Sequence, residues 1–168
     1  MSDLRLPTYT ECFVCGTAET GLGVQFCHAE DGSVVARDHV FKPLHQGFTG
    51  VVHGGTVAAV LDEISGWAAT IAHGDFVMTQ DIALSFKRMI KIGSPYLLHG
   101  WFVESKDGTL IAEGAVKDAA GAVYASCRSV FRPMPARMAN PFAEKMSYIE
   151  GGATSAWRKV HPIPAGGG

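Results

Sequence analysis

The stretch that decides the fold is Val52-His53-Gly54-Gly55-Thr56-Val57-Ala58-Ala59-Val60-Leu61-Asp62-Glu63, which continues to Ala72. A His-Gly-Gly turn opens a helix whose larger apolar residues recur at helical spacing: Val57, Val60, Leu61, Ile64, Trp67, Ala68 and Ile71. The opposite face carries Ala58, Asp62, Ser65, Gly66 and Ala69 instead of the Lys and Glu of a solvated face. We therefore expect a helix that is packed on both sides, with a small-residue face that another backbone can approach closely.

Two features of this helix indicate chemistry. Gly54 and Gly55 allow close approach of a ligand, and the first helical N–H groups, which lack internal partners, can stabilise a carbonyl oxygen that gains negative charge. The alternative is that these glycines only form a tight turn. Asp62 is a carboxylate in an apolar helix with no cation nearby in sequence, so it is a candidate general base or nucleophile. The alternative for Asp62 is a structural hydrogen bond to the backbone.

His53 and Asp62 are nine residues apart, which corresponds to a rise of roughly 13 Å along a helix. One helix therefore cannot direct the Gly54 amide and the Asp62 carboxylate at the same substrate atom. The two groups converge if two copies of the helix run antiparallel across a two-fold axis. We accordingly predict a homodimer or homotetramer with the small-residue face at the contact and two equivalent sites.

The rest of the chain is predicted to form strands at residues 23–28, 33–40, 76–89, 96–104, 109–117 and 122–131, with turn signals between several of them. The order β-β-α-β-β-β-β, with the last four strands linked by hairpins, predicts an α+β domain with an antiparallel sheet. We expect an N-terminal segment over residues 1–20, one domain over 21–133 and a Pro/Gly-rich extension over 134–168. A short helix is predicted at residues 141–149.

Composition excludes several classes of protein. The formal charge of −2 gives no case for binding nucleic acid or an anionic membrane. No apolar run reaches the roughly 18 residues of a membrane span, and the polar N-terminus does not resemble a signal peptide, so a cytoplasmic protein is expected. No P-loop or dinucleotide fingerprint occurs, and Ser65 lacks the G-x-S-x-G context of an α/β-hydrolase nucleophile.

The four cysteines include the pair in Cys12-Phe-Val-Cys15, which has zinc-knuckle spacing. A structural zinc site needs four ligands, and the adjacent pair Cys27-His28 would be an unusual way to complete one. Reduced thiols in a tight turn are therefore expected, with zinc or a redox pair as alternatives, and no metal site is predicted.

The segment from Gly50 through His53-Gly54-Gly55 to Asp62-Glu63 resembles the helix-start motif of hotdog-fold acyl-CoA thioesterases, in particular the PaaI-like branch of the thioesterase superfamily. The resemblance covers roughly residues 12–133. It implies a hotdog fold, in which an antiparallel sheet wraps around one long central helix. It also implies hydrolysis of a thioester to a free acid and coenzyme A, with no cofactor beyond the coenzyme A carried by the substrate.

The resemblance implies a role for individual residues. The Gly54 amide would polarise the thioester carbonyl, and Asp62 of the other subunit would activate water or attack directly. Thr79 would orient the water or Asp62, whereas an ordinary strand threonine is the alternative. Gln46 matches, less closely, a polar position that assists in polarising the carbonyl. The expected substrate-binding residues are His53, which shapes the turn, with Gly55, Trp67, Lys87 and Arg88.

The chain departs from the family pattern at Phe86-Lys87-Arg88-Met89, where the family often has Phe-x-Arg-Pro. The cationic residues Lys87, Arg88 and Lys91 can hold the phosphates of coenzyme A or form a solvated strand end. Three other functions stay open: a non-catalytic acyl-CoA binding module, a hotdog hydratase or dehydratase, and a structural dimer with a vestigial aspartate. The sequence does not indicate the acyl group.

Overall fold

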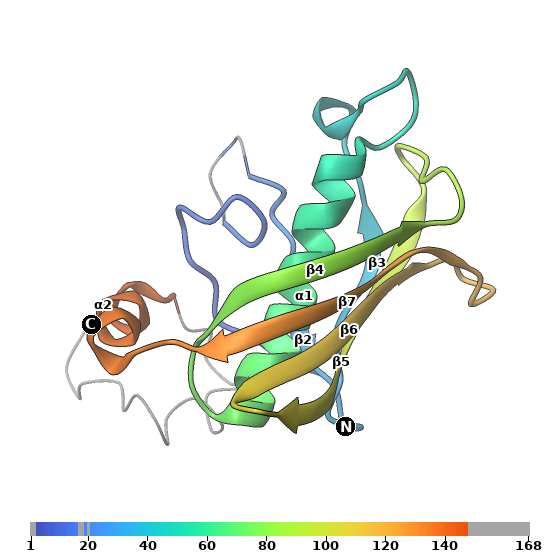
Figure 1. The fold of residues 1–168 in the computed structure, drawn as a ribbon. Helices are drawn as coiled ribbons and strands as arrows, with labels where there is room; N and C mark the ends of the chain where they lie inside the picture. The colour runs from blue at the N-terminus through green and yellow to red at the C-terminus, as the bar shows by residue number, and fades with distance from the viewer. Residues whose placement is uncertain (1–2, 17–18, 20, 148–168) are drawn as a thin grey trace.

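The computed structural model describes residues 3–16, 19 and 21–147 (Figure 1). Two α-helices occur in this part of the chain, α1 (Gly54–His73) and α2 (Ala136–Lys145), together with a short 3-10 helix, η1 (Pro43–His45). Its strands are β1 (Leu4–Arg5), β2 (Cys27–His28), β3 (Val34–Val40), β4 (Val77–Phe86), β5 (Pro95–Lys106), β6 (Thr109–Lys117) and β7 (Val123–Pro133). None of the described helices is long and apolar enough to cross a membrane.

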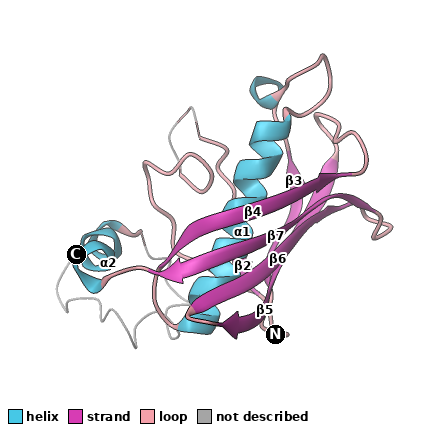
Figure 2. Cartoon of the chain, in the orientation of Figure 1, coloured by secondary structure: helices cyan, strands magenta, loops and turns pink. Residues whose placement is uncertain are grey.

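The seven strands form one antiparallel sheet that curves around α1, which confirms the expected hotdog fold (Figures 1 and 2). The strand order is β1-β2-β3-β5-β6-β7-β4. Of the last four strands, only β5, β6 and β7 are successive hairpin partners, and β4 pairs with β7 instead of β5. The prediction that hairpins link the last four strands was therefore wrong between β4 and β5, because residues 87–94 connect β4 at one end of the sheet order to β5 in its middle.

The core lies between α1 and the concave face of the sheet. The predicted apolar stripe is confirmed, since Val57, Val60, Leu61 and Ile64 are at most 2% exposed. The helix comes so close to β5 that a Cβ atom at Gly100 would lie 2.7 Å from the carbonyl oxygen of Ile64. A glycine is required there, because any side chain would clash with the helix backbone.

The small-residue face of α1 is covered in part by β7 of the same chain, so Ser65 and Ala69 cannot form the predicted contact with a partner, whereas Ala58, Asp62 and Gly66 stay partly exposed. Ser65 and Ala69 are fully buried, and the Ser65 hydroxyl lies 3.0 Å from the Ser129 hydroxyl of β7. A Cβ atom at Gly66 would lie 3.5 Å from the ring of Phe131. Small residues are needed here because β7 approaches the helix closely.

Described residues near both ends of the chain pack onto the core. Leu6, Val14 and Cys15 of the N-terminal segment belong to the same buried cluster as the helix. The backbone of Thr8 exchanges two hydrogen bonds with Ser147, just after α2. Helix α2 begins before the predicted start at residue 141, and residues 148 and 149 of that predicted helix lie outside the described residues.

Candidate active site

Helix α1 begins at a turn that leaves one backbone amide open. His53 is the N-cap residue, and its Nδ1 atom accepts a 2.9 Å hydrogen bond from the Gly55 N–H. Among the described residues, no hydrogen bond is recorded from the Gly54 N–H. The His53 side chain thus satisfies the second amide of the helix and leaves the first, at the positive end of the helix dipole, available to a ligand.

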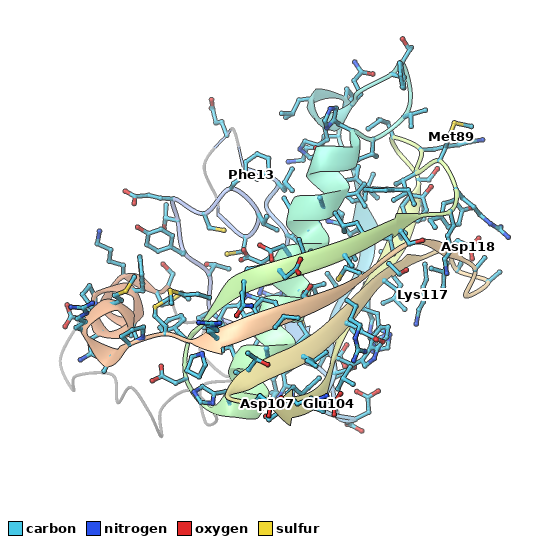
Figure 3. All side chains as sticks on the ribbon, in the orientation of Figure 1. Phe13, Met89, Glu104, Asp107, Lys117 and Asp118 are labelled. Atoms are coloured by element: carbon cyan, nitrogen blue, oxygen red, sulfur yellow. The ribbon has the colours of Figure 1, made fainter. Side chains whose placement is uncertain are left out.

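The Gly54 amide borders a cavity of about 500 Å³ at the start of α1. The wall of this cavity comes from the loop before the helix and from the end of β4 with the residues that follow, and it includes His53, Gly54, Phe86, Lys87 and Arg88. The guanidinium of Arg88 lies 5.8 Å from the centre of the Tyr124 ring. Met89, at the position where the resembled family often has proline, is 70% exposed at this end of the molecule, whereas Asp107 marks the opposite end (Figure 3).

Gln46 does not line this cavity. Its Oε1 atom accepts a hydrogen bond of 3.3 Å from the Gly50 N–H, and its side chain is exposed. The neighbouring His45 is buried, and its Nδ1 atom accepts a hydrogen bond from the Lys42 N–H. Both side chains therefore hold the shape of the loop before α1, and the loop contributes Gly47 and Phe48 to the cavity instead.

Asp62 and Thr79 line a second cavity, of about 310 Å³. The Thr79 hydroxyl of β4 donates a 2.8 Å hydrogen bond to Oδ1 of Asp62. Burial raises the pKa of the Asp62 carboxyl above its usual value, and the hydrogen bond from Thr79 acts in the opposite direction. No ion pair to Asp62 is recorded among the described residues. A half-buried carboxylate held by one hydroxyl and without a counter-ion is suited to accepting a proton or attacking an electrophile.

The Asp62 cavity is otherwise mostly apolar, and it includes residues that the sequence analysis did not assign to a site. Trp67, the predicted substrate-binding residue, lines it, and Tyr9 and Cys12 of the N-terminal segment and Phe142 of α2 also contribute. The spacing of Phe142 and Met146, which both line the cavity, was the available sign of an apolar helix face.

Glu63 lies in the same cavity and not in solvent. Both of its carboxylate oxygens are close to the Cys12 thiol, at 3.4 and 3.5 Å. Burial raises the pKa of Glu63 to about 7, and the neighbouring Cys12 and Asp62 charges act in the same direction. All four cysteines are free, as expected for reduced thiols. Cys27 and His28 lie on β2 and do not join Cys12 and Cys15, so the zinc alternative with those ligands is wrong.

Within one chain, the two halves of the predicted site are separate. Gly54 borders one cavity and Asp62 the other, and neither residue lines both. Their separation of eight positions corresponds to about 12 Å along α1. The geometry of a single chain therefore agrees with the argument that one helix cannot complete the site.

Comparison with known proteins finds a family similarity over this region. A sequence model of the thioesterase superfamily matches residues 49–125. This range contains the α1 start, Asp62, Thr79 and the Lys87–Arg88 pair. No curated protein sequence gave a match.

Solved structures of thioesterase superfamily proteins share the fold. One such protein is 27% identical with a TM-score of 0.61, and the match covers 67% of this chain and 55% of that chain, so this chain spans little more than half the length of that relative. Zebra fish thioesterase superfamily member 2 is 22% identical with a TM-score of 0.60, covering 68% of this chain and 86% of that one. A Bacillus halodurans protein solved with CoA is 21% identical with a TM-score of 0.58, covering 69% and 77%.

Proposed function

We propose that the protein is an acyl-CoA thioesterase, in which the Gly54 amide polarises the thioester carbonyl and Asp62 of a second copy drives the attack on it. The observation that carries the proposal is the Asp62–Thr79 pair. It is a half-buried carboxylate, bound to a hydroxyl at 2.8 Å, in a mostly apolar cavity. The superfamily match over residues 49–125 and a similar fold solved with CoA support the substrate class.

The edge strand β4 supplies a way for two copies to complete the site. It ends the strand order, so its outer edge pairs with no other described strand. Thr79, near the start of β4, contacts Asp62, whereas the ring of Phe86, at its end, lies 3.7 Å from the Cβ position of Gly54. If a second copy pairs antiparallel along β4, the Thr79 end of one strand meets the Phe86 end of the other. Asp62 of one copy would then lie beside the Gly54 amide of its mate.

The reaction would follow from these groups. The carbonyl oxygen of the thioester accepts a hydrogen bond from the Gly54 N–H, which stabilises the negative charge that develops on it. Asp62 either accepts a proton from the attacking water or attacks the carbonyl carbon, and Thr79 holds the carboxylate in place. The thiol of coenzyme A is a good leaving group, so no strong general acid is required. Lys87 and Arg88 would hold the coenzyme A phosphates beside the helix start, and no other cofactor is required.

The test is hydrolysis of a panel of acyl-CoA esters, followed with a thiol-reactive dye. We expect Asp62→Asn to lower kcat/KM by at least about a hundredfold while folding is retained, because the amide can neither accept the proton nor attack the carbonyl. Asp107→Asn is the matched control, since it makes the same change in charge in the exposed turn between β5 and β6, outside both cavities and away from β4. Equal turnover by the Asp62→Asn and wild-type proteins on every active ester would refute the catalytic role.

A non-catalytic acyl-CoA binding module is the main alternative function. The same panel separates it from the enzyme, because a binding module takes up acyl-CoA without releasing thiol. The hydratase or dehydratase alternative predicts a change in the absorbance of an enoyl-CoA without thiol release.

A further inference from the structure

Three acidic side chains from distant parts of the chain meet beside the Asp62 cavity. The thiols of Cys12 and Cys15 and a carboxylate oxygen of Glu63 all lie within 4.8 Å of one another. Cys12 and Cys15 come from the N-terminal segment and Glu63 from α1. Glu63 makes no ion pair that is recorded among the described residues. The Cys12 thiol donates to the Glu63 carboxylate, and deprotonation of both thiols beside this carboxylate would be costly unless a cation compensated the charge.

The backbone of the Cys12–Cys15 turn is arranged around the first thiol. The N–H groups of Val14 and Cys15 point at Sγ of Cys12, at 3.3 and 3.4 Å. The turn is closed by a hydrogen bond of 3.0 Å from the Gly16 N–H to the Cys12 carbonyl oxygen. Amide donors directed at a sulfur favour its thiolate form, which is the form that binds a metal ion.

The tight form of this turn requires a glycine at position 16. A Cβ atom at position 16 would lie 2.2 Å from the Cys12 carbonyl oxygen and 2.5 Å from that of Thr10. Only glycine fits between these two carbonyl groups. The sequence Cys-x-x-Cys-Gly is therefore built into a turn that holds both thiols against Glu63.

We propose that Cys12, Cys15 and Glu63 bind a Zn²⁺ ion. Zinc takes thiolate sulfur at about 2.3 Å and carboxylate oxygen at about 2.1 Å in tetrahedral geometry, which sets the sulfur–oxygen separation at about 3.6 Å. The Cys12–Glu63 separations of 3.4 and 3.5 Å are already near this value. Two sulfur ligands favour zinc over the oxygen-preferring Mg²⁺ and Ca²⁺.

A site with three protein ligands leaves a fourth position for water or another small ligand. All three ligand residues line the cavity that contains Asp62 and Thr79. The ion would fasten the N-terminal segment onto α1 and compensate the charge of Glu63 next to Asp62. This site is independent of the proposed hydrolysis, because the ligands are separate from the groups assigned to that reaction.

The test uses the full-length protein, reduced and stripped of metal with a chelator, and titrated with Co²⁺ and with Zn²⁺. We expect saturable uptake of a single equivalent and a thiolate-to-Co²⁺ charge-transfer absorption band. Cys12→Ser and Glu63→Gln should each weaken binding by at least roughly tenfold, and Cys12→Ser should also reduce the charge-transfer band. Cys27→Ser is the matched control, because Cys27 is a partly buried free thiol on β2 outside the cluster, and it should bind as the wild type does.

Several results would overturn the proposal. These are the absence of saturable binding by the reduced wild-type protein, unchanged affinity in Cys12→Ser, or unchanged affinity in Glu63→Gln. A Cys12–Cys15 disulfide found by mass spectrometry, with no metal uptake after its reduction, would instead identify a redox pair. The wild-type titration decides the matter even if a variant fails to fold, which far-ultraviolet circular dichroism would detect.

Discussion

At the scale of single residues, Asp62 shows how an apolar helix can carry a reactive group. It lies where α1 meets the edge strand β4, and its environment is part core and part cavity. The Thr79 hydroxyl is the one side-chain hydrogen-bond donor to Asp62 recorded among the described residues. The position and ionisation of the carboxylate therefore depend on a single hydroxyl group.

Replacing Thr79 tests that dependence. Thr79→Val removes the hydroxyl but keeps the shape, and we expect kcat/KM for the best acyl-CoA ester to fall by about 10- to 100-fold, the usual worth of a hydrogen bond to a charged group. Thr79→Ser keeps the hydroxyl and should retain most of the activity. Equal rates for the Val and Ser variants would show that the hydrogen bond has no part in turnover.

At the scale of secondary-structure elements, the packing of α1 on the sheet depends on two glycines in different ways. Gly100 of β5 faces a helix carbonyl at a distance that excludes a Cβ atom, whereas Gly66 of α1 leaves an ordinary van der Waals gap to Phe131. Gly100→Ala should lower the free energy of unfolding by about 1–3 kcal/mol through overpacking. Gly66→Ala should raise it by up to about 1 kcal/mol, because alanine is the better helix former. Urea denaturation measures both, and a stabilising Gly100→Ala would contradict the close approach.

The strand β3 contains a titratable group that should make stability depend on pH. His39 follows Asp38, which has a φ of 53°, at the irregularity in the β3–β5 pairing, and its ring packs edge-on against Phe41. Burial lowers the pKa of His39 from 6.5 to about 4, and the facing charges of His45 and Lys42 act in the same direction. The folded protein therefore holds His39 neutral under conditions in which the unfolded chain binds a proton.

It follows that His39 destabilises the fold as the pH decreases from 6.5 towards 4. The wild-type protein should lose up to about 3 kcal/mol more of its free energy of unfolding across this window than His39→Leu does. Denaturation at pH 7.5 and pH 4.5 measures the difference, and comparing the two proteins removes the contributions of other titrating groups. Parallel losses in both proteins would show that His39 is not the group responsible.

At the scale of the whole molecule, the two cavities on one chain lead to a prediction about mixed oligomers. Gly54→Pro removes the amide hydrogen at the first helical position, where proline is well tolerated. Gly54→Ala is its control, because alanine keeps the amide and its Cβ atom would lie 3.7 Å from the Phe86 ring, an ordinary contact distance. Gly54→Pro and Asp62→Asn should each be inactive alone. When the two variants are co-expressed and pair at random, half of the dimers are mixed, and one of the two sites in each mixed dimer is intact. The mixture should therefore recover roughly a quarter of the wild-type activity.

Differently tagged copies show whether mixed dimers have formed. Mixed dimers without activity would contradict a site shared between two copies, and full activity in either parent would remove that residue from the reaction. Sedimentation of the wild-type protein gives the oligomeric state directly.

The sequence pattern alone determined the central helix, its buried stripe and an α+β domain with an antiparallel sheet. These follow from helical spacing around Ile64, from strand alternation and from local turn signals such as Gly108, all of which act between near neighbours in the chain. The hotdog fold was implied by the resemblance of residues 50–63 to a family motif and not by these patterns. The sequence pattern also singled out Asp62, because a charge in an apolar helix is visible without knowledge of any distant contact.

Only the tertiary structure decided which distant segments meet. It assigned β4 to the edge beside β7, covered the Ser65 face with that strand, and brought the Cys12 turn to Glu63, 51 residues away in sequence. Such contacts depend on how the whole sheet curves around the helix and on the direction in which each side chain then points. Local propensity carries no information about either, which is why the Asp62 cavity, with its walls from both ends of the chain, could not be predicted from the sequence pattern.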